Sequence, residues 1–286
     1  VRTFNKAFAP YGLPRTAFKP SYGIAEATLF VATIEPSAQA SVVYFDREQL
    51  GAGHAVRVPE GTPSAVAQVS CGRTARSLWA VIVDPDTGTE LPDGDVGEIW
   101  LQGENVGRGY WGLPEETQLA FGAKLQTRLG TGSHTEASTV EGTWLRTGDL
   151  GVYLDGELYV TGRIADLVII DGRNHYPQDI EATVAEASPM VRRGYVTAFS
   201  VPADRVPGSG AGNADTGERL VIIAERAAGT SRDDPLPAIE AIRAAVSQRH
   251  GVAIADVRFL PAGAIPRTTS GKLARRAARA EYLSGT

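Results

Sequence analysis

Residues 21–28 (Ser-Tyr-Gly-Ile-Ala-Glu-Ala-Thr) combine side chains that are suited to a flat, charged ligand. The glycine lets the backbone approach such a ligand closely, and Tyr22 offers a ring on which it can stack. Glu26 is a hard oxygen ligand of the kind that holds Mg²⁺ near phosphates. Taken alone, the segment is more simply interpreted as a buried turn with a capping glutamate.

Residues 145–151 (Leu-Arg-Thr-Gly-Asp-Leu-Gly) and 162–166 (Gly-Arg-Ile-Ala-Asp) supply a second candidate site. A carboxylate at a tight turn can accept hydrogen bonds from the vicinal hydroxyls of a ribose, which makes Asp149 a candidate. Arg163 has a forked donor suited to ribose or phosphate oxygens. Singly, Asp149 is equally well a turn residue, and Arg163 a solvated surface charge.

Residues 265–272 (Ile-Pro-Arg-Thr-Thr-Ser-Gly-Lys) superficially resemble a phosphate-binding P-loop. The pattern fails because Pro266 stands where glycine is needed and Leu273 where serine or threonine is needed. A hydroxyl-rich loop that presents Lys272 remains. Lysine is a compact point charge, suited to a phosphoryl oxygen or a forming carboxylate–phosphate bond.

Other residue patterns favour structure or exclude chemistry. Residues 97–103 and 107–111 (Gly-Arg-Gly-Tyr-Trp) predict a strand and a glycine-rich turn with packed aromatic rings. The four histidines lack metal-ligand spacing, and no Gly-x-Ser-x-Gly sequence of a serine hydrolase is present. The single cysteine, Cys71, excludes a disulfide framework and a cysteine-rich zinc site and fits a reducing compartment, so we expect a cytoplasmic protein.

Two structural parts are expected to position these segments. Closely spaced short strands at 42–45, 78–83, 98–101 and 157–160 predict a small, barrel-like β subdomain over about 41–160. Beyond a boundary between 162 and 166, the pattern predicts a compact α+β domain. Its expected strands are 167–170, 195–201, 220–225 and 257–260. One expected helix begins at Pro177, and two others cover 236–250 and 272–283. A mobile loop is expected at 207–217.

Length and charge limit the function classes. The 286 residues exceed one average domain, and the net charge of −5 argues against a nucleic-acid binder. No apolar run approaches the roughly 20 residues that a transmembrane segment needs. The chain begins with Val and shows no leader, so we expect it to start inside a longer protein.

The order and spacing of the segments resemble the second half of the adenylate-forming (acyl-adenylate) superfamily. The shared patterns are Tyr-Gly-x-x-Glu, Gly-Glu-(x)n-Gly-Tyr-Trp, Thr-Gly-Asp, Gly-Arg-x-x-Asp and Pro-x-Thr-x-x-Gly-Lys, between about residues 10 and 280. Residues 21–31 and 172–181 (Gly-Arg-Asn-His-Tyr-Pro-Gln-Asp-Ile-Glu) are similar to fatty-acyl-AMP ligases. Within that group the chain looks most like the mycobacterial long-chain-fatty-acid–AMP ligases of mycolic-acid synthesis.

The resemblance implies a mixed α/β and α+β fold. Residues 1–162 would end the large nucleotide- and acyl-binding domain, 163–166 would be a hinge linker, and 167–286 a small mobile C-terminal domain. The implied reaction uses ATP and Mg²⁺ to convert a long-chain fatty acid to acyl-AMP and pyrophosphate. The acyl group then passes to an acyl carrier protein domain of a polyketide synthase.

The resemblance also implies a role for each matching residue, and the two domains would rotate between the two half-reactions. The nucleotide pocket would be lined by Ser21, Tyr22, Gly23 and Ala25, and Glu26 would hold Mg²⁺. Asp149 would bind the ribose hydroxyls and Arg163 the ribose–phosphate. Lys272 would bind the reacting carboxylate and α-phosphate, and Ala165 would lie at the hinge. Relatives often carry a charged residue at the hinge position, which leaves the behaviour of Ala165 open.

The family's Thr/Ser/Gly-rich phosphate loop, ending Pro-Lys-Gly, does not occur in these 286 residues. We therefore expect the chain to be a C-terminal fragment that is inactive alone. Two alternatives stay open. One is a fragment of an acyl-CoA synthetase, although those enzymes usually carry a different sequence at 172–181. The other is a non-catalytic module that binds a nucleotide or a partner.

Overall fold

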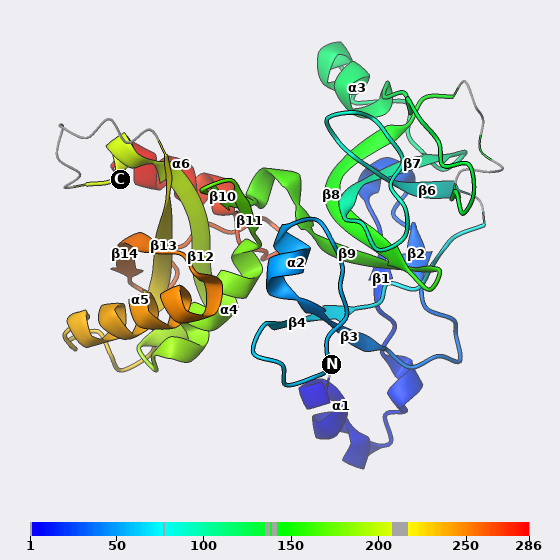
Figure 1. Cartoon of the computed structure of the whole chain (residues 1–286). Helices are drawn as coiled ribbons and strands as arrows, with labels where there is room; N and C mark the ends of the chain where they lie inside the picture. Colours follow the sequence, from blue (N-terminus) through cyan, green and yellow to red (C-terminus); the bar gives the residue numbers. More distant parts are fainter. Residues whose placement is uncertain (1, 77, 135–137, 139–141, 208–216, 286) are drawn as a thin grey trace. The chain divides into compact units, whose positions relative to one another are not determined.

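The computed structural model describes residues 2–76, 78–134, 138, 142–207 and 217–285 (Figure 1). The chain divides into two compact units, Val1–Ile164 and Ala165–Thr286, and each has its own hydrophobic core. The division falls within the expected linker, 163–166. That the units turn about this linker stays a prediction.

Unit 1 is built on a four-stranded antiparallel sheet in the order β6-β7-β8-β9. Alternate residues of its strands face two cores, because Ile82 and Ile99 belong to one cluster and Val83 and Trp100 to the other. The strands of this sheet are β6 (Leu78–Val83), β7 (Gly97–Gly103), β8 (Leu145–Leu154) and β9 (Glu157–Arg163).

Smaller sheets and short helices complete unit 1. A two-stranded sheet pairs β3 with β4, and a three-stranded one has the order β1-β2-β5. These elements are β1 (Ser21–Tyr22), β2 (Ala32–Thr33), β3 (Val42–Asp46), β4 (Ala65–Val69), β5 (Arg73–Thr74), α1 (Arg2–Phe8), α2 (Arg47–Gly51) and α3 (Pro114–Phe121). Among the described residues no sheet closes on itself, so the expected β subdomain consists of separate open sheets rather than a barrel.

Strand β8 departs from the expectation of a tight turn at residues 147–149. It pairs with β7 both before and after Asp149 and with β9 from Asp149 onward, and the β7–β8 register shifts opposite Ile99. Gly148 has φ of 70°, a left-handed conformation that glycine adopts without steric cost. The Thr-Gly-Asp segment therefore forms a kink within a strand, because ladder pairing on both sides keeps the strand continuous.

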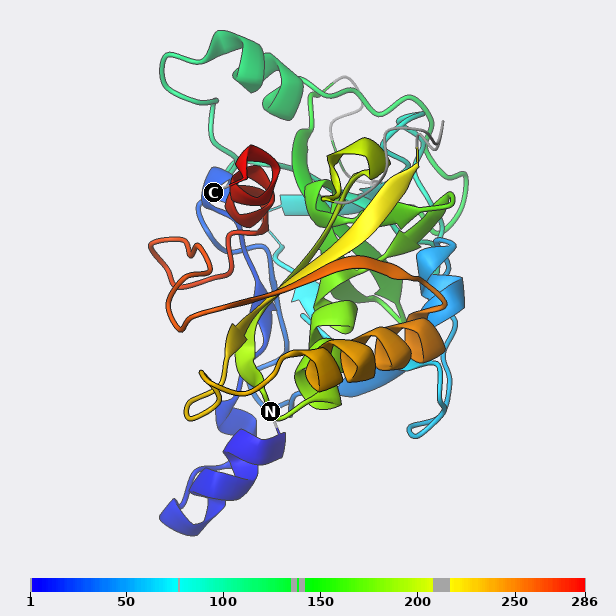
Figure 2. The ribbon, with the colours of Figure 1, turned by 90° about the vertical axis from the view of Figure 1, so that its left-hand side faces the viewer.

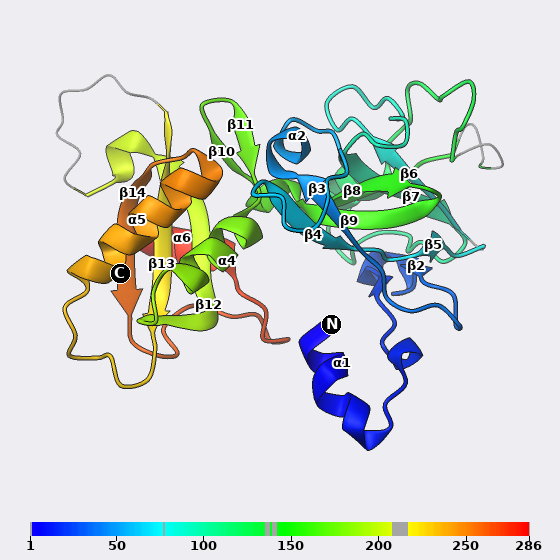
Figure 3. The same cartoon turned by 60° about the horizontal axis from the view of Figure 1, so that its bottom comes forward.

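Unit 2 contains a three-stranded sheet of β12 (Val191–Pro202), β13 (Glu218–Arg226) and β14 (Ile254–Leu260) in that order. Helices α4 (Pro177–Ala187) and α5 (Leu236–His250) cover the face that includes Leu220 and Ile222. Helix α6 (Arg275–Ser284) covers the opposite face through Tyr282, as Figures 2 and 3 show. A hairpin of β10 (Val168–Ile170) and β11 (Arg173–His175) packs beside this sheet.

Most expected elements of unit 2 are confirmed, including α5 with its left-handed stop at Gly251. The last helix begins at Arg275 rather than Lys272, because residues before it bond back into their own loop. The Lys272 amide donates to Thr268 Oγ1 at 3.1 Å, and the Ala274 amide donates to the Pro266 carbonyl at 3.0 Å. Most of the expected loop at 207–217 lies outside the described residues. No described helix is both long and apolar enough to cross a bilayer.

Candidate functional site

Three residues predicted to bind nucleotide meet in unit 1 although they are distant in sequence. Asp149 Oδ2 accepts a hydrogen bond from the Tyr22 hydroxyl at 2.7 Å, and Oδ1 accepts one from Arg163 Nε at 2.8 Å. Asp149 is only 6% exposed, so its charge depends on these donors. Tyr22 lies on β1, Asp149 on β8 and Arg163 on β9. These three strands thus bring the stacking candidate and the arginine to the ribose candidate, Asp149.

The electrostatics of this cluster keep Tyr22 a donor. Burial, together with the charge and hydrogen bond of Asp149, raises the pKa of the Tyr22 hydroxyl above its ordinary value. The Arg163 side chain is 63% exposed, so solvent screens its ion pair with Asp149. Each carboxylate oxygen has two acceptor sites. The Asp149 carboxylate therefore has acceptor sites that Tyr22 and Arg163 do not use.

The loop that carries Tyr22 and Glu26 is tightly folded. A Cβ atom at Gly23 would lie 1.8 Å from the Leu29 carbonyl oxygen, so only glycine fits there. Thr28 and Leu29 have φ of 53° and 75°, a costly backbone conformation for residues with side chains. The predicted Ser21 and Ala25 are exposed on the same loop.

Glu26 has a partner that the sequence did not predict. Its Oε1 accepts a hydrogen bond from the Tyr110 hydroxyl at 2.8 Å, and its backbone carbonyl accepts one from the Gly107 amide at 2.7 Å. Burial and Glu26 raise the pKa of Tyr110 to about 12. We interpreted Tyr110 from sequence as a packed aromatic ring; it does pack edge-on against Phe121. The signal for its second role was its phenol group, which can donate a hydrogen bond.

The residues around Glu26 fit Mg²⁺ only if substrate phosphates and waters supply its other ligands. Among the described residues, no group of three His, Cys, Asp or Glu side chains could hold a metal. Mg²⁺ is commonly held by one or two carboxylates together with substrate phosphates and waters. Glu26, on the loop that also carries Tyr22, fits that pattern as the single protein carboxylate.

Lys272 lies in an exposed loop of unit 2 that is braced at its base. Within the part of the chain that the structure describes, its ammonium forms no hydrogen bond or ion pair. Arg267 Nη1 donates to the Gly271 carbonyl at 2.6 Å and Nη2 to the Gly194 carbonyl at 2.8 Å. The Arg267 guanidinium also lies 4.0 Å from the centre of the Tyr195 ring. These contacts hold the backbone of the loop and leave the lysine side chain exposed.

Arg275 links three segments of unit 2 just after this loop. Its Nε and Nη2 bond both carboxylate oxygens of Glu181 at 2.7 Å, and its Nη1 bonds Asp166 Oδ2 at 3.1 Å. Ala165 immediately precedes Asp166, so the predicted hinge position borders this network. Lys272 and Ala165 therefore belong to unit 2, and the other predicted site residues to unit 1.

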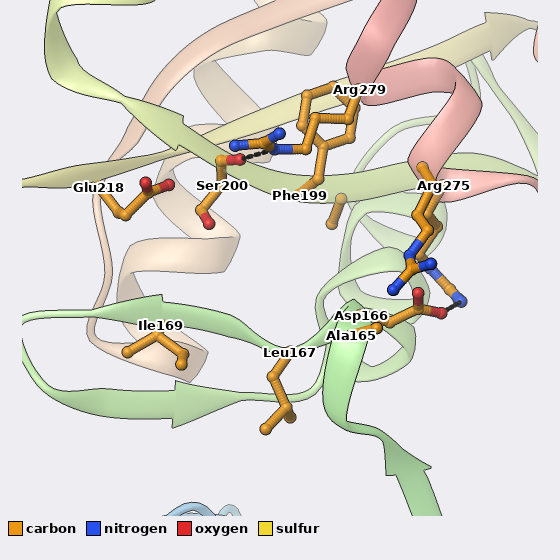
Figure 4. Close-up of a pocket in the computed structure, with 11 residues that line it drawn as sticks. Ala165, Asp166, Leu167, Ile169, Phe199, Ser200, Glu218, Arg275 and Arg279 are labelled. Carbon is orange, nitrogen blue, oxygen red and sulfur yellow. Dashed lines mark hydrogen bonds and ion pairs between the residues drawn. The ribbon is translucent and has the colours of Figure 1, made fainter. Parts of the chain in front are cut away.

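Arg275 also borders a pocket of about 330 Å³ in unit 2 (Figure 4). Arg279 lies on its wall, where its Nε donates to the Ser200 carbonyl. The carboxylates of Asp166 and Glu218 also line the pocket. Arg276 lines it as well, so the pocket carries charges of both signs, and we assign it no ligand.

Comparison with known proteins shows what the chain resembles. Residues 1–111 match the family described as AMP-binding enzyme. Over its full length the chain is 53% identical to the long-chain-fatty-acid–AMP ligase FadD32 of Mycolicibacterium smegmatis, of which it covers 47%. The chain is thus similar to the AMP-binding enzymes over its first 111 residues and to a long-chain-fatty-acid–AMP ligase over its full length. The resemblance inferred from the ordered sequence patterns is thereby confirmed.

Two further comparisons concern the same chain. It is 41% identical over 98% of its length to a putative fatty-acid–CoA ligase, FadD21, of Mycobacterium tuberculosis, covering 45% of it. A solved structure from a study of fatty acyl-adenylate ligases from E. coli and L. pneumophila matches 99% of the chain, with TM-score 0.78 and 31% identity, and the chain covers 45% of it. The expected mixed fold of an adenylate-forming ligase is confirmed. The chain spans about half the length of the curated relatives it matches.

Proposed function

We propose that the complete protein activates a long-chain fatty acid with ATP, giving acyl-AMP and pyrophosphate. It then transfers the acyl group from acyl-AMP to the phosphopantetheine thiol of an acyl carrier protein domain of a polyketide synthase, which forms a thioester and releases AMP, in mycolic-acid synthesis. The observation that carries the proposal is the Tyr22–Asp149–Arg163 cluster, because it presents a buried carboxylate of the kind that binds ribose hydroxyls. The identity to the long-chain-fatty-acid–AMP ligase supports the substrate class.

In the first half-reaction, the fatty carboxylate attacks the α-phosphorus of ATP and pyrophosphate leaves. Asp149 holds the ribose hydroxyls and Arg163 the ribose–phosphate, which fixes the nucleotide for attack. Lys272 stabilises the negative charge that develops between the carboxylate and the α-phosphate, a contribution of about 10²–10³ in rate. A Mg²⁺ ion held by Glu26 would neutralise charge on the phosphate oxygens.

The second half-reaction requires Lys272 to withdraw, and the contacts beside the linker support a hinge there. Arg163 is bonded to Asp149 within unit 1, and Asp166 is bonded to Arg275 within unit 2. Only Ile164 and Ala165 stand between these two anchored residues. We propose that rotation of the two units occurs at these two residues.

The test uses the complete protein with fatty acid, ATP and either an acyl carrier protein or CoA. We expect acyl-AMP to form and the acyl group to move to the carrier protein, with little acyl-CoA. Rapid acyl-CoA formation would instead establish the acyl-CoA synthetase alternative. The 41% identity to a putative fatty-acid–CoA ligase is the reason to test that alternative. Absence of acyl-AMP with either acceptor would favour the non-catalytic module.

A further inference from the structure

A buried glutamate lies beside the candidate ribose-binding residue. Glu98, on β7, is 1% exposed, and its Oε1 accepts a hydrogen bond from the Gly148 amide at 3.0 Å. Its Oε2 accepts one from Trp100 Nε1 at 2.9 Å and pairs with Arg146 Nη2 at 2.7 Å. One carboxylate thus joins the strand on which it lies to both residues that flank Thr147 on β8.

We infer that Glu98 is a positioning residue for Asp149, a role that rests on the proposed function. The kink at Gly148 interrupts the β7–β8 ladder opposite Ile99, so the Gly148 amide lacks the ladder partner that a regular strand would supply. Glu98 accepts from that amide instead. Because Asp149 follows directly, the hydrogen bond fixes the direction in which its carboxylate leaves the strand.

Thr147 braces the same kink from the other side. Its Oγ1 donates to the Ile99 carbonyl at 2.7 Å and accepts from the Asp149 amide at 3.1 Å. The two backbone amides of the kink, those of Gly148 and Asp149, are therefore both bonded to side chains. This arrangement holds Asp149 against Tyr22 and Arg163 before any nucleotide binds, which is the preorganisation that tight binding requires.

Glutamine cannot replace Glu98 without a conflict. The groups around the carboxylate are all donors: the Gly148 amide, the Trp100 indole and the Arg146 guanidinium. The glutamine amide has an NH₂ group with two donors and an oxygen that accepts. Its NH₂ group would therefore point at one of these donor groups. The kink would then lose its anchor, or Arg146 would lose its counter-charge.

The test compares ATP with 2′-deoxy-ATP as substrate of the complete protein. A carboxylate that accepts from a ribose hydroxyl makes the enzyme prefer ATP by about 10- to 100-fold in kcat/KM. We expect Glu98→Gln to raise the KM for ATP about tenfold, with less effect on kcat, and to bring the preference for ATP below about threefold. Glu98→Asp keeps the charge but is too short to reach Gly148, and it should give the same loss of preference if Glu98→Gln does not fold.

Glu90 supplies a matched control in the same unit. It is also 1% exposed, and it accepts hydrogen bonds from the Leu129 and His134 amides and from Ser133 Oγ. Glu90→Gln should keep the wild-type preference for ATP, because this carboxylate holds a different loop. A folded Glu98 variant that keeps that preference, or an equal loss in Glu90→Gln, would overturn the inference.

The outcomes also separate this inference from the proposed function. If the wild-type protein forms acyl-AMP equally well from both nucleotides, the ribose role of Asp149 is wrong and the role of Glu98 falls with it. If the wild type prefers ATP and the folded Glu98 variants do so equally, the proposed function stands and the inference alone fails.

Discussion

Replacing Arg275 with alanine is expected to destabilise unit 2 strongly. Arg275 bonds both oxygens of Glu181 and one oxygen of Asp166, and the side chains of these three residues are only 20%, 10% and 20% exposed. Alanine would leave the Glu181 carboxylate buried with the Ala198 amide, at 3.1 Å, as its remaining donor. An uncompensated buried charge of this kind is costly.

The magnitude follows from the burial of the pair. Removing one partner of a buried ion pair costs about 3–5 kcal/mol, and the partial exposure of Arg275 and Asp166 places this case near 3 kcal/mol. Since about 1.4 kcal/mol corresponds to a tenfold change in an equilibrium constant, the unfolded population of unit 2 should rise about 100-fold. Replacing both partners, as in Glu181→Leu with Arg275→Met, should cost less than the single alanine variant because it leaves no unpaired Glu181 charge.

Amide hydrogen exchange of the whole chain, analysed by mass spectrometry, measures this change in unit 2 directly. Leu220 and Ile222 on β13 are fully buried, and the slow exchange of their peptides reports the opening of that core. Glu186→Ala is the control, because its pair with Arg249 is 62% and 45% exposed and should contribute less than about 1 kcal/mol. Exchange in Arg275→Ala within threefold of the wild type would refute the reasoning.

Three further predictions concern other parts of the molecule. Tyr110→Phe removes the hydroxyl that donates to Glu26 and should raise the Mg²⁺ concentration for half-maximal acyl-AMP formation about tenfold in the complete protein; an unchanged Mg²⁺ titration would contradict it. Gly23→Ala places a Cβ atom 1.8 Å from the Leu29 carbonyl oxygen and should lower the free energy of unfolding by about 1–3 kcal/mol in urea denaturation, whereas unaltered stability would show that the loop yields freely. Burial and Arg173 lower the pKa of His175 below 6.5, so the unfolded chain binds protons more readily and stability should fall as the pH drops below about 6.5. His175→Gln should flatten that part of the urea-measured profile, and an identical slope would exclude His175 as its source.

The sequence predicted elements where one local pattern dominated. The sequence predicts helix α5, which ends at His250 before its cap at Gly251, and the strand of consecutive apolar residues 78–83, because periodicity and stop signals agree there. Thr-Gly-Asp has turn composition and by itself predicts a turn, and only its pairing with β7 and β9 keeps it in strand β8. Tertiary contacts of this kind are not encoded in local composition.

The candidate site was predictable as residue types but not as a network. Tyr22, Asp149 and Arg163 were selected individually for nucleotide chemistry, and the structure brings them into contact. Glu98 and Tyr110 were missed because each lies in a segment whose apolar neighbours indicate packing. Their polar partners come from segments 50 and 84 residues away in the sequence, which no local pattern reveals.

ATP–pyrophosphate exchange by the complete protein with a long-chain fatty acid tests the central claim most directly. That claim gives Lys272 the developing charge of adenylation and Asp149 the ribose of the nucleotide. Lys272→Ala should lower kcat by about 10²–10³ with a nearly unchanged KM for ATP, whereas Asp149→Asn should mainly raise that KM. Exchange at the wild-type rate and KM in both variants would contradict the account.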